Sequence, residues 1–158
     1  MGKNKIKIVK QLGENTCWEA AAKMILKYIK RYEDAEYIIE KQDDEEASAA
    51  RLVADFLGYW PKDESQLPNW TQLTGHIGAG GIYLSLVADK PFVPDAVVKG
   101  GHWIIVNGYE GRDKLYIVDP GVGREIERKL RDDGEGTYII LNGVPCYFQY
   151  SFIIHKSM

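Results

Sequence analysis

The spacing of apolar residues in this 158-residue chain changes part-way along, and that change restricts the fold more than any single motif. Residues 17–32 show helical spacing with charged residues on the opposite face, and helical spacing returns at 49–57. Shorter helices are expected at 35–41 and around 73–77, and the acidic run 43–46 suits a helix start. These patterns predict a helical first half.

Strand patterns dominate the second half. They predict one strand at 82–87 and two hairpins, whose strands are 102–109 with 115–119 and 137–141 with 146–154. The turns are expected at 110–113 and at Asn142-Gly143, while 124–131 has no clear pattern. Helices followed by antiparallel strands indicate an α+β fold. The length suits a single domain, 1–158, with a helical part at about 14–78 and a β part at about 81–155.

Charge and cysteine content exclude several classes of function. Lys and Arg number 20 against 23 Asp and Glu, a net charge of −3, so no nucleic-acid partner is expected. Cys17 and Cys146 are far apart and lack paired ligand spacing, so we predict no disulfide, metal site or cofactor. The chain has no signal-peptide core and no run of the ~20 apolar residues that span a membrane. We expect a monomer without a membrane partner, cytoplasmic as synthesised, and export without a cleavable signal stays open.

A cysteine directly follows a helix-capping sequence near the start of the chain. Thr16-x-x-Glu19 matches a capping box, which places Cys17 at the first helical position. Free backbone N–H groups and the positive end of the helix dipole favour a thiolate there. Gln11 lies upstream, where its side-chain amide can turn back toward the sulfur.

The hairpin at 102–119 brings a histidine and a carboxylate together. If its turn is centred between Gly111 and Arg112, Asp119 lies opposite Ile104 and diagonal to His102, about 7 Å away between backbones. A register slip of one residue would send His102 and Asp119 to opposite faces of the sheet. A nucleophile, a base and a group that orients the base form the general pattern of an activated thiol.

Three motifs occur in a characteristic order: Gln11-x5-Cys17-Trp18, Gly101-His102-Trp103 and Val118-Asp119-Pro120. This order resembles the papain-like cysteine peptidase superfamily, above all its compact bacterial branch of effector proteases and bacteriocin-leader peptidases. The resemblance implies a papain-like fold, in which a helical lobe packs on an antiparallel β-sheet lobe and the cleft lies between them. It also implies a protein or peptide substrate.

The resemblance assigns roles residue by residue. Gln11 would stabilise the oxyanion, Cys17 would be the nucleophile, His102 the general base and acid, and Asp119 the group that orients His102. The residues expected to contact substrate are Trp18, Gly101 and, from its place in a proline-flanked loop, Trp70. Two departures stand out: Glu19 occupies a position where small residues are common, and its charge opposes a thiolate. Leader peptidases usually have Cys-Gly where this chain has Cys17-Trp18.

Other interpretations stay open at this stage. The same triad would serve a deamidase or transglutaminase acting on protein glutamine, and an inactive papain-like module would bind a partner without catalysis. A metal site built from Cys17, His102 and Asp119 is weak, because these residues lack a local ligand pair. Cys146 is expected in the core, and His76 and His155 at the surface.

Overall fold

The computed structural model describes residues 2–11, 17–31, 33, 35, 49–58, 66–94, 98 and 101–156, apart from the side chains of Leu52 and Phe56. Helices and strands together make an α+β structure with an antiparallel, curled sheet. The helices are α1 (Cys17–Tyr28), α3 (Ala49–Leu57) and α4 (Trp70–Gly78). The strands are β1 (Gly2–Lys3), β2 (Gly81–Ala88), β3 (His102–Glu110), β4 (Lys114–Asp119), β5 (Arg124–Lys129), β6 (Arg131–Asp132), β7 (Thr137–Leu141) and β8 (Val144–His155).

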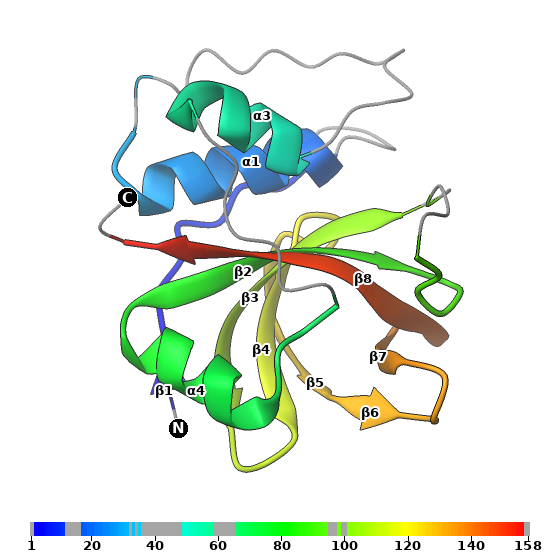
Figure 1. The fold of residues 1–158 in the computed structure, drawn as a ribbon. Helices are drawn as coiled ribbons and strands as arrows, with labels where there is room; N and C mark the ends of the chain where they lie inside the picture. Colours follow the sequence, from blue (N-terminus) through cyan, green and yellow to red (C-terminus); the bar gives the residue numbers. More distant parts are fainter. Residues whose placement is uncertain are drawn as a thin grey trace.

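The strands form one sheet in the order β5-β4-β3-β2-β8-β7-β6, and β1 pairs with the far end of β3. Every pairing is antiparallel. The sheet curls so that its two sides approach each other, and Arg128 of β5 donates from Nε to the carbonyl oxygen of Ile140 in β7 at 3.0 Å. Figure 1 shows this curl below β8.

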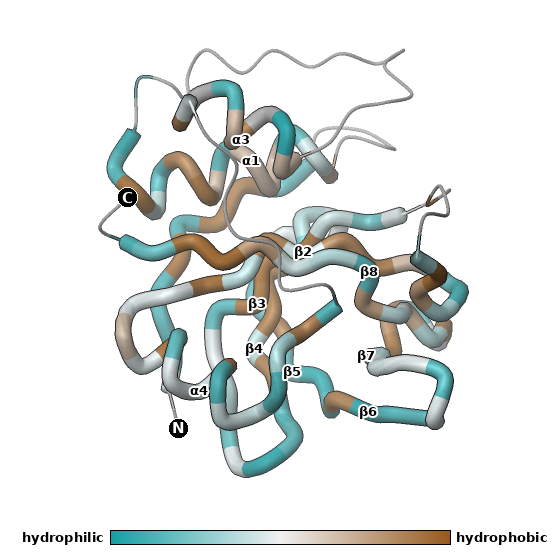
Figure 2. Tube along the Cα trace, viewed as in Figure 1, coloured by the Kyte–Doolittle hydropathy of each residue, from teal (hydrophilic) through white to brown (hydrophobic). Residues whose placement is uncertain are grey.

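Helices cover both faces of the sheet. Figure 1 shows α1 and α3 together on one side and α4 on the other. Because side chains alternate along a strand, neighbouring residues of β3 join different cores: Trp103 and Ile105 pack under α1, and Ile104 and Val106 pack with α4. Apolar residues accordingly line α1 and the central strands, whereas the region around β5 and β6 is mostly hydrophilic (Figure 2).

Local signals define the helix ends that matter for the site. α1 begins at Cys17, as the sequence predicts, although its expected cap, Thr16, lies outside the described residues. It ends where Lys30 takes a left-handed φ of 63° and the Arg31 amide bonds the Leu26 carbonyl at 2.8 Å. α4 begins after Asn69, whose side chain accepts a hydrogen bond from the Gln72 amide at 2.9 Å.

Most predicted elements are confirmed, including the two hairpins and the helix at 49–57. The sequence did not reveal β5 and β6, which occupy the segment without a clear pattern. The helix expected at 35–41 and the acidic run 43–46 fall largely or wholly outside the described residues. Within the described part of the chain, no helix combines the length and apolarity that crossing a membrane requires.

Candidate active site

His102 and Asp119 form the centre of the site. They stand at the start of β3 and the end of β4, and His102 Nε2 lies 2.6 Å from Asp119 Oδ1. The carboxylate is almost fully buried, while the imidazole is 30% exposed. Because Asp119 occupies Nε2, Nδ1 is the ring nitrogen that remains for another partner.

The turn after β4 holds the Asp119 carboxylate in place. Oδ1 also accepts the Gly121 amide at 2.9 Å, and the Asp119 carbonyl accepts the amides of Val122 and Gly123. Burial acts to raise the pKa of Asp119, but hydrogen bonds from His102 and from backbone amides, together with the charge of His102, lower it below its ordinary value. The carboxylate is therefore ionised at neutral pH.

Cys17, the first residue of α1, reaches the same site from the core between α1 and the sheet. Its side chain is buried, and Sγ accepts a hydrogen bond from the backbone amide of Trp103 at 3.4 Å. The donor belongs to the residue directly after His102, so the strand that carries the histidine also contacts the sulfur. The sequence did not point to this amide, because every residue except proline has a backbone N–H and the residue type does not show which one donates.

The protonation state of His102 follows from its two partners. Burial acts to lower its pKa, but hydrogen bonds with Asp119 and Cys17, and the charges of both, outweigh burial and raise the pKa to about 10. His102 is thus an imidazolium at neutral pH. An imidazolium that contacts both a thiol and a carboxylate is the arrangement that activates a cysteine.

Gln11 lies at the turn that holds Asp119. Its backbone amide donates to the Pro120 carbonyl at 3.0 Å. A Cβ placed on Gly121 would stand 3.3 Å from Asp119 Oδ1, 3.5 Å from Gln11 Oε1 and 3.8 Å from His102 Cε1. Three of the four predicted catalytic side chains therefore converge around Gly121, and Cys17 contacts Trp103, the residue next to His102.

Ile104 lies level with Asp119 as predicted, but the turn and the strand pairing that lead to this register differ from the predicted ones. The turn comprises the three residues 111–113, so Glu110 faces Lys114 and the ladder starts one residue out of the expected register. A bulge at Asn107 absorbs the additional residue, since Gly108 faces Tyr116 while Val106 faces Ile117. Ile105 then faces Val118, which leaves Ile104 level with Asp119, as predicted.

The three residues expected to contact substrate lie elsewhere or have other contacts. Trp18 is 7% exposed and belongs to the core under α1. Gly101 packs against the Leu86 side chain, since a Cβ there would stand 2.6 Å from Leu86 Cδ1. Trp70 is the first residue of α4 and packs edge-on against Tyr109, on the sheet face opposite to the α1 core. The structure does not bring Trp70 to Cys17.

Glu19 differs from expectation. The sequence predicts it on the polar face of α1, but it is 5% exposed, and its Oε1 pairs with Lys23 Nζ at 2.9 Å. α1 is covered by α3 on one side and the sheet on the other, which buries positions that a surface helix would expose. The Lys23 ammonium offsets the negative charge that Glu19 carries near Cys17.

Residues outside the site have structural partners. Cys146 is partly buried in β8 and packs against the α4 core, and burial raises the pKa of its thiol. His76 and His155 were expected at the surface, but they are half-buried and pack edge-to-face, and His76 Nδ1 also hydrogen-bonds Tyr83. Among the described residues, no three His, Cys, Asp or Glu side chains cluster in a way that would hold a metal ion.

No protein-family model matches the chain, and no curated protein matches it either.

Proposed function

We propose that the chain is a cysteine peptidase of papain-like fold that hydrolyses a peptide or amide bond through an acyl-enzyme on Cys17. The observation that carries the proposal is the Cys17–His102–Asp119 arrangement. Asp119 Oδ1 lies 2.6 Å from His102 Nε2, the backbone amide next to His102 donates to Cys17 Sγ at 3.4 Å, and Cys17 together with Asp119 raises the pKa of His102. Few structural roles require a buried cysteine, an imidazolium and a buried carboxylate in one chain of contacts.

The acylation step follows from these contacts. The Cys17 thiolate attacks the carbonyl carbon, and the carbonyl electron pair moves to oxygen. His102 then gives the Nδ1 proton to the leaving nitrogen as the C–N bond breaks, and the carbonyl reforms as a thioester. Throughout, Asp119 accepts a hydrogen bond from the Nε2–H of His102 without taking the proton. This hydrogen bond keeps Nδ1 directed at the reacting atoms and stabilises the imidazolium.

In deacylation His102 acts as the general base instead of the general acid. His102, now neutral, takes a proton from water through Nδ1 as the water oxygen attacks the thioester carbonyl. The C–S bond breaks, the carboxylic acid product leaves, and the thiolate–imidazolium pair is restored. No oxidant, metal or cofactor enters either half-reaction, so the residues of the site supply every proton transfer.

Negative charge on the substrate oxygen needs donors in both steps. The Cys17 amide begins α1, where backbone N–H groups have no partner within the helix. We assign it as one oxyanion donor and the Gln11 side-chain amide, which lies beside the Asp119 turn, as the other. Each such donor contributes about 3 kcal/mol to transition-state stabilisation in comparable sites.

The arrangement of helix and sheet supports the papain-like assignment. A buried helix on one side of an antiparallel sheet presents the cysteine at its first residue, and adjacent strands supply the histidine and the acid. The motif order along the chain is the order that the superfamily uses. Partners of this kind of site are proteins or peptides.

The test compares substrates cleaved by the wild type and by Cys17→Ala. Proteome-wide analysis of new N-termini should find peptide bonds that only the wild type cleaves, with no ammonia released. Ammonia release without new N-termini would instead identify a deamidase or transferase that uses the same triad. Identical N-termini and no ammonia in both samples would contradict a thiol hydrolase and leave a binding module.

A further inference from the structure

The bulge at Asn107 places the side chains of His102 and Asp119 on the same face of the sheet. Beside the turn, Glu110 faces Lys114, Tyr109 faces Leu115 and Gly108 faces Tyr116. If this ladder continued without a bulge, Ile105 would lie opposite Asp119. His102, three residues earlier on β3, would then point to the other face of the sheet. The additional residue must therefore be absorbed between the turn and the site.

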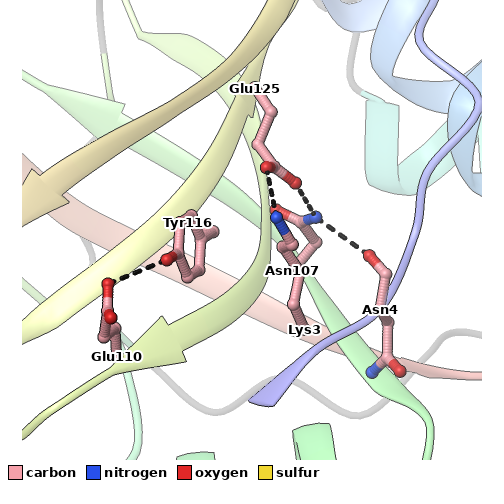
Figure 3. A network of polar contacts seen from close by, with 6 residues as sticks. All are labelled: Lys3, Asn4, Asn107, Glu110, Tyr116 and Glu125. Carbon is pink, nitrogen blue, oxygen red and sulfur yellow. Dashed lines mark hydrogen bonds and ion pairs between the residues drawn. The ribbon is translucent and has the colours of Figure 1, made fainter. Parts of the chain in front are cut away.

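The side chain of Asn107 ties the bulge to two other segments. It is fully buried, and its Nδ2 donates to the Asn4 carbonyl at 2.9 Å and to Glu125 Oε1 at 2.8 Å. Its backbone carbonyl accepts the Asn4 amide at 2.8 Å. Figure 3 shows Asn107 between the N-terminal segment and β5, with Glu125 also paired to Lys3.

The partners of Asn107 are themselves fixed. Asn4 donates from Nδ2 to the carbonyls of Ile77 and Gly81 at 2.8 and 2.9 Å, which joins the N-terminal segment to α4 and β2. The next residue after the bulge, Gly108, has no room for a side chain because a Cβ would stand 2.8 Å from the Gly2 carbonyl oxygen. The bulge is thus held at one position along β3.

We propose that Asn107 is a positioning residue of the triad: its hydrogen bonds to Asn4 and Glu125 fix the bulge that puts His102 and Asp119 on one face. The inference rests on the proposed function for its catalytic consequence. Neither Asn107 nor its two partners hydrogen-bonds a triad side chain in the described structure, so Asn107 acts through the backbone register alone.

The test uses Asn107→Asp, which keeps the shape of the side chain but replaces its two donated hydrogen bonds with a negative charge beside Glu125. Nuclear Overhauser effects between β3 and β4 report the register, and the titration of His102 reports its contact with Asp119. We expect the contact between Ile105 and Val118 to weaken in favour of Val106 with Val118. The His102 pKa should fall by about one pH unit or more toward its ordinary value.

Two further variants separate register from stability. Adding Glu125→Gln to Asn107→Asp allows the amide to donate to the new carboxylate, so the double variant should recover part of the register and part of the His102 pKa. Asn69→Ala removes the cap at the first turn of α4, at the other end of the helix from the Ile77 carbonyl that accepts from Asn4, and should lower the melting temperature while leaving both signals unchanged. If Asn107→Asp fails to fold, Glu125→Ala is measured in its place. The Glu125 side chain is partly exposed, so its removal disturbs the fold less.

One outcome overturns the proposal. If Asn107→Asp, or Glu125→Ala in its place, lowers the melting temperature as Asn69→Ala does but keeps the wild-type register and His102 pKa, Asn107 only stabilises the fold. Both readouts are made without substrate. The positioning role can therefore fail while cleavage by the wild type still supports the peptidase, and the peptidase can fail while the register result is unaffected.

Discussion

Asp119→Asn tests the electrostatic basis of the site most informatively, because it removes one charge and keeps the shape of the side chain. The His102 pKa lies at about 10 against an ordinary value of 6.5. At 1.36 kcal/mol per pH unit, that difference corresponds to ~5 kcal/mol of preference for the imidazolium. Asp119 and Cys17 share this preference, since both raise the pKa against the opposing effect of burial.

A hydrogen bond to a charged group contributes about 1.5–3 kcal/mol. We therefore expect Asp119→Asn to lower the His102 pKa by about one to two pH units, measured from the imidazole carbon shifts by NMR. Asp133→Asn is the matched control, because Asp133 is also a hydrogen-bonded carboxylate with a lowered pKa, but it lies in the connection between β6 and β7. It should leave His102 unchanged.

The same substitution predicts a change in how stability depends on pH. A histidine whose pKa is raised on folding stabilises the native state fully below its unfolded pKa, and this contribution is lost as pH rises toward the folded value. The unfolding free energy of the wild type should thus decline between pH 6.5 and about 10. The unfolding free energy of Asp119→Asn should decline less over the same pH range. An unchanged His102 pKa in Asp119→Asn would refute the reasoning.

Three other changes have defined outcomes. Cys17→Ala should also lower the His102 pKa, because Cys17 is its second hydrogen-bonding and charged partner, and NMR titration of the variant measures this. Gly121→Ala should reduce turnover roughly tenfold, about 1.4 kcal/mol, with little change in melting temperature, since a Cβ would stand 3.3 Å from Asp119 Oδ1. Lys23→Ala should cost on the order of 2 kcal/mol in chemical denaturation by leaving the buried Glu19 charge without its ion pair, whereas Lys27→Ala should cost much less.

Local patterns in the sequence were sufficient for much of the fold and for the contact between His102 and Asp119. The helix that begins at Cys17 follows from its periodicity, and the turn at Asn142-Gly143 follows from two residues that accept positive φ, observed at 52° and 75°. The pairing of His102 with Asp119 was also predicted. That prediction held because two departures cancel, a turn one residue longer than assumed and a bulge of one residue.

Tertiary contacts explain what the sequence could not reveal. The bulge depends on Asn107 meeting Asn4, which is 103 residues away along the chain, and Glu125, which is 18 residues away. Trp70 was placed near the site from its proline-flanked loop, but the Asn69 cap starts α4 at Trp70 on the other face of the sheet. Glu19 is buried because α1 is covered by more than one element, which its own periodicity does not indicate.

The central claim is that Cys17 is an activated nucleophile, and a competition between the two cysteines tests it directly. Cys17 is 6% exposed, whereas Cys146 is partly exposed and burial raises the pKa of its thiol. Accessibility alone therefore favours labelling of Cys146. Iodoacetamide labelling at pH 6, followed by peptide mass spectrometry, should instead modify Cys17 first, and Asp119→Asn should slow that reaction selectively. Faster labelling of Cys146, or equal slow labelling of both, would contradict the account.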